Sequence, residues 1–207
     1  MPFTAKPKTV LSKDEVMQMI FDCFDKWALD EEKALETAAL ISLLYRTGAR
    51  ISEALGMRKD DIKLDEKFMY LTVRSLKQEN RKIAFRVLPF RLYPNDAEKN
   101  FFNKIFLAHA KTKEKGQYLW EAHHSTPNNI SPPIHRTTAW RRIVELNPNI
   151  YLHVFRHSLA TKLADAGQSD AQLRRWFMWS YTSKMPMIYT NQSKIHLIPI
   201  SEAGDID

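Results

Sequence analysis

A histidine and an arginine three residues apart, His153 and Arg156, stand at the start of a predicted helix, in the stretch HVFRH. Because an α-helix turns once in about 3.6 residues, both side chains share one face. Free backbone N–H groups at a helix start favour an anion, so the pair is suited to contacting a phosphate. Short pairs of this kind also arise by chance, and the chemistry needs further partners. His157 points to another face and is interpreted as a packing or helix-surface residue.

Arg50 lies where one predicted helix ends and the next one begins. The first helix stops at Gly48, the expected left-handed terminator, and the second starts at Ile51. An arginine on this corner is held rigidly, and Glu53, three residues further on, is expected to fix its guanidinium. The alternative is an ordinary surface arginine at a helix start.

Further cations lie on a predicted β-hairpin. Residues 68–74 and 83–88 alternate between apolar and polar side chains, which indicates two short strands. The tip between the strands carries Lys77, Arg81 and Lys82. A solvated basic loop is the default explanation of these charges, and contact with a polyanion is the functional one.

The last third of the chain adds an indole and a phenol. A short helix capped by Ser169 is predicted to run to Trp179, and Tyr189 follows in a segment that contains Pro186. A tyrosine hydroxyl is a weak nucleophile until it is positioned and relieved of its proton.

The elements that must position these residues are mostly helical. Apolar spacing and capping signals predict helices over 13–28, 30–47, from 51, from 94, 136–146, 153–167 and 169–179. Residues 118–120 are a candidate third strand beside the hairpin, and residues 1–10 are interpreted as a linker. We therefore expect an α+β fold that is mostly α-helical, with a small β-hairpin or three-stranded sheet.

Three arginines stand on one of these helices. Arg136, Arg141 and Arg142 lie in the predicted helix 136–146. A basic helix in a basic protein is a reasonable contact for a duplex backbone, and a solvated face explains the charges almost as well.

Composition sets the class of partner. The chain has 207 residues, and its 31 basic against 24 acidic residues give a net charge of +7. This excess favours nucleic acid first and an anionic membrane surface second. No apolar run approaches the roughly 18 residues of a spanning helix, and the N-terminus lacks the apolar core of a secretory signal, so we expect a cytoplasmic protein. The single cysteine, Cys23, is expected in the core, and His123 and His124 lack the spaced ligands of a metal site.

In chain order these residues resemble the catalytic domain of the tyrosine recombinases, the phage integrase family. The resemblance covers residues 11–195 and rests on Arg50 within TGARISE, Lys77 on a hairpin, His153 with Arg156, Trp179 and Tyr189. The ending, in which WS at 179–180 is followed by MP at 185–186 and then by Tyr189, resembles integrases of archaeal viruses and plasmids in particular. In those proteins tryptophan often replaces the second histidine of the family.

The resemblance implies a role for each residue. Arg50 and Arg156 would grip the non-bridging oxygens of a DNA phosphate, a task that suits planar, permanently charged guanidinium groups. Tyr189 would attack the phosphorus and form a 3′-phosphotyrosine link. Lys77, or Lys82 if the hairpin register shifts, would protonate the leaving 5′-oxygen, and His153 would handle protons near the phosphate. Trp179 would donate its indole N–H or pack the pocket.

The resemblance also implies partners. The expected partner is double-stranded DNA at an attachment site, with self-association on DNA into a tetrameric synapse, and neither a metal nor a small-molecule cofactor is expected. Family members usually carry an N-terminal helical domain that closes around DNA. We expect that domain to be absent here, with a linker at 1–10 and a tail at 196–207 that either docks on a neighbouring subunit or is frayed.

Three functions remain open at this level. The leading one is site-specific integration or excision of a mobile element by DNA cleavage and rejoining. A type IB topoisomerase would use the same side chains to relax supercoiled DNA. A DNA-binding module that no longer catalyses would keep only the basic surface and the architecture.

Overall fold

The protein is described here by a computed structural model that covers residues 10–75, 84–122, 131–151 and 153–191. The fold is α+β and mostly α-helical, as predicted, with a three-stranded sheet. Its elements, in order, are α1 (Lys13–Lys26), α2 (Glu31–Thr47), α3 (Ile51–Leu55), the 3-10 helix η1 (Lys59–Asp61), β1 (Ile62–Leu64), β2 (Phe68–Arg74), β3 (Phe85–Arg91), α4 (Phe101–Lys111), α5 (Arg136–Leu146), α6 (Val154–Asp165), α7 (Asp170–Phe177) and α8 (Met185–Thr190).

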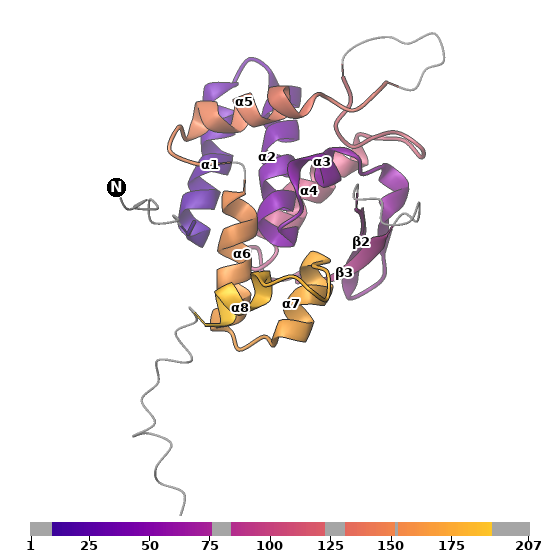
Figure 1. The fold of residues 1–207 in the computed structure, drawn as a ribbon. Coiled ribbons are helices and arrows are strands. Elements are labelled where there is room, and N and C mark those ends of the chain that lie inside the picture. Colours follow the sequence, from indigo (N-terminus) through magenta and orange to yellow (C-terminus); the bar gives the residue numbers. More distant parts are fainter. Residues whose placement is uncertain (1–9, 76–83, 123–130, 152, 192–207) are drawn as a thin grey trace, which may run out of the picture.

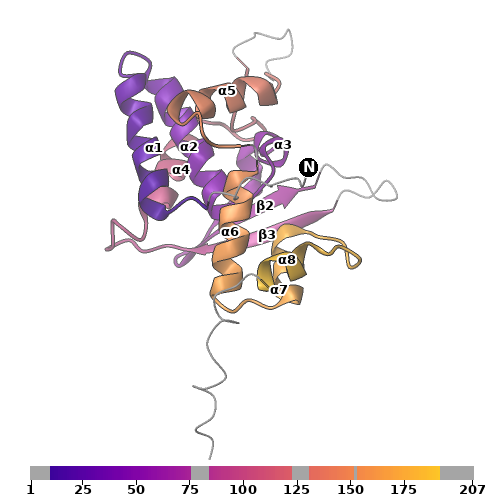
Figure 2. The same cartoon turned by 60° about the vertical axis from the view of Figure 1, so that its left-hand side comes forward.

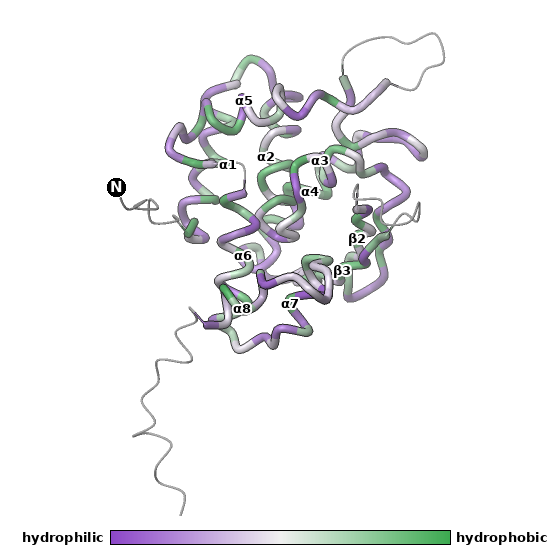
Figure 3. The backbone as a smooth tube through the Cα atoms, viewed as in Figure 1, coloured by the Kyte–Doolittle hydropathy of each residue, from purple (hydrophilic) through white to green (hydrophobic). Residues whose placement is uncertain are grey.

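Helix α2 forms the centre of the molecule (Figure 1). It packs against α1, α4, α5 and α6, and most of its residues are buried. Figure 3 shows frequent hydrophobic colour along this helix. Because α2 is surrounded on several sides, its C-terminal end is held in a fixed place, and the functional corner predicted at Arg50 follows directly from that end.

The sheet is antiparallel, in the order β1-β2-β3. Leu71 of β2 lies opposite Ile62 of β1 and Leu88 of β3. The apolar side chains of the predicted alternation in β2, Met69, Leu71 and Val73, are all buried. The sheet therefore presents one face to the helical core.

The candidate strand at 118–120 is wrong. Tyr118 makes only an isolated bridge with Arg58, and the third strand is β1. Trp120 is fully buried and donates its indole N–H to the Glu36 carbonyl on α2 at 3.1 Å. The apolar run at 118–120 reflects burial under the helices rather than strand pairing.

Helix ends mostly follow the local signals. Ser12 and Ser169 form capping boxes, and Gly48 ends α2 with a φ of 59°. Helix α4 begins at Phe101 rather than near 94, because the preceding residues form turns. Helix α7 ends at Phe177 because Met178 takes a left-handed conformation.

Helix α6 joins two parts of the core. It packs against α2 on one side and against α7 and α8 on the other, as Figure 2 shows. A small apolar cluster that includes Ala160, Leu173, Phe177 and Tyr189 fills the space between α6, α7 and α8. The last two helices are thereby fixed against α6. Among the described residues, no helix has the length and apolar character needed to cross a bilayer.

A buried histidine in α4 gives the fold a pH dependence. His109 is 1% exposed, its Nε2 lies 2.6 Å from the Leu119 carbonyl oxygen, and burial lowers its pKa from 6.5 to about 4. A lowered pKa means that the unfolded chain takes up the proton first as the pH falls. Stability is therefore lost between about pH 6.5 and pH 4, by roughly 3 kcal/mol at the lower limit.

Urea unfolding of the unaltered chain and of His109→Gln over pH 4 to 7 measures this effect. We expect the unfolding free energy of the variant to depend less steeply on pH, by roughly 3 kcal/mol across the range. Equal pH dependence of the two proteins would contradict this assignment.

Candidate active site

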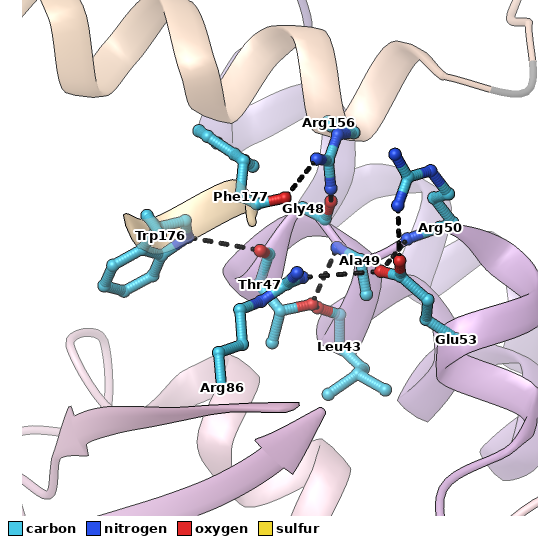
Figure 4. A network of polar contacts seen from close by, with 10 residues as sticks. All are labelled: Leu43, Thr47, Gly48, Ala49, Arg50, Glu53, Arg86, Arg156, Trp176 and Phe177. Atoms are coloured by element: carbon cyan, nitrogen blue, oxygen red, sulfur yellow. Dashed lines mark hydrogen bonds and ion pairs between the residues drawn. The ribbon is translucent and has the colours of Figure 1, made fainter. Parts of the chain in front are cut away.

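The corner between α2 and α3 holds Arg50 beside a buried carboxylate (Figure 4). Glu53 Oε1 accepts a 2.6 Å hydrogen bond from the Arg50 guanidinium, and Glu53 Oε2 accepts a 3.0 Å bond from the Arg50 backbone N–H. The Glu53 side chain is 1% exposed, whereas that of Arg50 is 28% exposed. The carboxylate thus anchors the arginine from inside while the guanidinium keeps access to the surface.

Arg156 ties α6 to the same corner. Its guanidinium donates to the Gly48 carbonyl at 2.8 Å and to the Phe177 carbonyl at 2.6 Å. It also lies over the rings of Phe177 and Trp179, 4.8 and 5.5 Å from their centres. Gly48 is required here, because a Cβ at this position would lie 2.6 Å from the Phe177 ring. Two arginines that are distant in sequence are therefore brought to one place.

Tyr189 lies in α8 against the aromatic side of this cluster. Its ring is 5.6 Å from that of Trp179 and nearly parallel to it, with an interplanar angle of 5°. Its hydroxyl oxygen is 3.3 Å from Nδ1 of His157. The interpretation of His157 as a packing residue is confirmed, since it is buried, but its contact with the Tyr189 hydroxyl was not predicted. Residues at consecutive helix positions diverge by about 100°, but α8 packs across α6 and meets His157 there.

His153 is the N-cap residue of α6 and is exposed. Partial burial lowers its pKa, and the positive charges of Arg156 and Arg50 lower it further. The imidazole is therefore favoured in its neutral form, in which one ring nitrogen can accept a proton. The charges of both arginines reach His153, so the imidazole and the two guanidinium groups belong to one site.

The charges of the cluster favour an anion at this place. The pKa of Arg156 is lowered by burial and by the charges of Arg50 and Arg86, while Glu53 opposes the shift. Burial raises the pKa of the Tyr189 hydroxyl, with a further increase from Tyr151 and an opposing effect from Arg156. A bound phosphate would relieve the repulsion among the guanidinium groups, and the tyrosine would need a proton acceptor before it could attack.

The other predicted residues are placed differently. Lys77, Arg81 and Lys82 lie outside the described residues. Arg142 forms an ion pair with Glu36, and both side chains are largely buried, so the structure does not favour it as a DNA contact. Arg136 and Arg141 are exposed on α5.

Sequence reasoning missed Arg86 as well as the contact of His157. Arg86 stands on β3 with a side chain that is 4% exposed, and Glu53 Oε2 lies 3.5 Å from its guanidinium. The available signal was a charged residue in phase with the apolar Leu88 and Phe90 of the same strand. Among the residues that the structure describes, no group of three His, Cys, Asp or Glu side chains could hold a metal ion.

The fold and this site define the class of the protein as a tyrosine recombinase catalytic domain. Residues 9–196 match the phage integrase family, and the chain belongs to that family. It is 30% identical over 163 residues to the tyrosine recombinase XerD of Corynebacterium glutamicum, covering 76% of this chain and 48% of the relative. It is 26% identical over 168 residues to XerC of Listeria monocytogenes, covering 81% of this chain and 53% of the relative.

Solved structures show the same fold. The XerH recombinase bound to its difH substrate matches with a TM-score of 0.59 and 18% identity, over 96% of this chain and 53% of that one. The XerA recombinase matches with a TM-score of 0.59 and 19% identity, over 96% of this chain and 67% of that one. The chain spans about half the length of the curated relatives it matches. The particular likeness to archaeal viral integrases stays a prediction.

Proposed function

We propose that this chain cleaves and rejoins DNA strands through a 3′-phosphotyrosine intermediate on Tyr189, as a site-specific recombinase that integrates or excises a mobile element. The observation that carries the proposal is the hydrogen bond from Arg156 to the Gly48 carbonyl, two residues before Arg50. It brings both guanidinium groups to one place, and Tyr189 stacks on the Trp179 ring over which Arg156 lies. The names of the relatives as tyrosine recombinases support the same activity.

The arrangement suits phosphoryl transfer. Charge accumulates on the non-bridging oxygens as the Tyr189 oxygen bonds to phosphorus and the bond to the 5′-oxygen breaks. Arg50 and Arg156 stabilise that charge with fixed donors, and Lys77 supplies the proton to the leaving oxygen. His153, beside both arginines and favoured in its neutral form, accepts the proton that the Tyr189 hydroxyl loses as its oxygen bonds to phosphorus. The phosphotyrosine bond conserves energy for religation, so the scheme needs no nucleotide cofactor.

Duplex binding is proposed to use the basic surface. The exposed Arg136 and Arg141 would contact the backbone, together with Arg81 and Lys82 of the predicted hairpin tip. Phosphate contacts release counterions, so affinity should fall steeply with salt. The XerH recombinase, which shares this fold, was solved bound to its difH substrate. By analogy we propose double-stranded DNA as the partner of this chain, with assembly into a tetrameric synapse.

A nicked suicide duplex tests the proposed function. The unaltered chain is incubated with a duplex that is nicked close to the cleavage site. After cleavage, the short fragment that carries the free 5′-hydroxyl diffuses away and cannot be rejoined. A denaturing gel then reveals any covalent protein–DNA adduct. We expect an adduct without added metal or ATP. If the chain binds duplexes but forms no adduct with any of them, it is a non-catalytic DNA-binding module. If it relaxes supercoiled plasmids that lack a specific site, it is a type IB topoisomerase.

A further inference from the structure

Arg86 occupies a position where the strand pattern would place an apolar residue. Along β3 the buried positions are Arg86, Leu88 and Phe90, and the residues between them are exposed. Arg86 lies opposite Val73, whose side chain is fully buried in the sheet face that meets the helices. A permanently charged side chain in such a place is costly and calls for a specific reason.

The burial of the guanidinium excludes direct contact with DNA. Its Nε and both terminal nitrogens have almost no accessible surface, and they have no hydrogen-bond partner among the described residues. Its ion pair joins one terminal nitrogen to Glu53 Oε2 at 3.5 Å, which is a charge contact rather than an aligned hydrogen bond. Arg86 can therefore affect the rate of a reaction at the surface only by acting on another side chain.

Glu53 is that side chain, because it lies between two arginines. One oxygen faces the Arg50 guanidinium, and the other receives the Arg50 backbone N–H and the charge of Arg86. Figure 4 shows Arg86 reaching from the sheet toward the carboxylate while Arg50 meets it from the other side. With one carboxylate between two arginines, the orientation of Glu53 decides where the Arg50 guanidinium points.

We propose that Arg86 is a positioning residue that holds Glu53 from the core side and so orients Arg50 toward the phosphate. This inference rests on the proposed cleavage function. The pKa of Arg86 is lowered first by burial and also by the charge of Arg50, and the charge of Glu53 opposes this shift.

A purely structural role predicts a different outcome. If Arg86 only stabilised the fold, its removal would lower the unfolding free energy and leave cleavage by the folded protein unchanged. If Arg86 positions Glu53, Arg86→Met removes one partner of a buried ion pair and should lower the unfolding free energy, although Glu53 keeps its ion pair with Arg50. Cleavage by the folded protein should slow as well.

The test measures single-turnover cleavage at saturating suicide duplex for Arg86→Met, Arg86→Lys, Glu53→Gln and the double variant Arg86→Met with Glu53→Gln. Arg91→Met is the matched control, since it removes an exposed arginine from the same strand. We expect Arg86→Met to slow cleavage by about 10- to 100-fold without weakening duplex binding. Arg86→Lys should restore part of the rate, and the double variant should be no slower than its slower parent, because coupled residues are not additive.

A second readout does not depend on cleavage. NMR of the arginine side chains, with the Arg50 signal assigned through Arg50→Lys, should show a changed Arg50 guanidinium in Arg86→Met and not in Arg91→Met. Any one of three results would overturn the inference. These are an unchanged Arg50 signal in Arg86→Met, additive effects of the two substitutions in the double variant, and cleavage by Arg86→Met at the wild-type rate. If the unaltered chain forms no adduct, the proposed function fails, and the Arg50 signal alone decides whether Arg86 positions the corner.

Discussion

Replacement of Arg156 by alanine is expected to slow strand cleavage by about 10²- to 10³-fold, the loss seen when a preorganised donor to a developing anion is removed. The side chain meets the Gly48 and Phe177 carbonyls and lies over two aromatic rings, so its position is fixed before DNA binds. A donor that needs no reorganisation stabilises the transition state more than a mobile one. Arg156→Lys should also be severely slowed, because an ammonium group cannot form the same planar fork.

The measurement is the rate of adduct formation at saturating duplex, corrected for the folded fraction. Losing the side chain leaves two buried carbonyls without a donor, which should lower the unfolding free energy by about 1–3 kcal/mol, measured separately by urea unfolding. Arg91→Ala removes the same charge from an exposed site and should cleave normally. Cleavage by folded Arg156→Ala at the wild-type rate would exclude Arg156 from the site.

Replacement of Tyr189 by phenylalanine is expected to abolish the covalent adduct completely. The change removes only the hydroxyl oxygen that would bond to phosphorus, and the ring can keep its stacking on Trp179. The lost contact with His157 should lower the unfolding free energy by only about 1 kcal/mol. A folded protein without activity is therefore the predicted outcome.

Tyr151 provides the matched control for that substitution. Its hydroxyl is buried with no hydrogen-bond partner in the part of the chain that the structure describes, and it raises the pKa of Tyr189, so it is a second phenol near the site. Tyr151→Phe should retain adduct formation on the same duplex. An adduct that persists in Tyr189→Phe and disappears in Tyr151→Phe would reassign the nucleophile.

Local signals explain how much of the fold was predictable. The capping boxes at Ser12 and Ser169 and the left-handed Gly48 involve residues within a few positions of each other, so the sequence carries them directly. The ion pair of Arg50 with Glu53 has the same origin, because three residues along a helix bring two side chains together. The corner of the site could therefore be predicted.

Tertiary contacts explain what sequence reasoning missed. His157 meets Tyr189 because α8 packs across α6, and Arg86 meets Glu53 because the sheet packs beneath α3. The apolar run that ends at Trp120 resembles a strand, yet its burial comes from α2. In each case the decisive partner is more than 30 positions away in the chain, beyond the reach of any spacing rule.

The most direct test of the central claim is to locate the covalent bond. The adduct formed on a suicide duplex is digested with nuclease and protease, and mass spectrometry identifies the peptide that carries the residual nucleotide. We predict that the phosphate is attached to the oxygen of Tyr189. Attachment to any other residue, or a peptide containing Tyr189 that carries no nucleotide while the adduct is present, would contradict the proposed function.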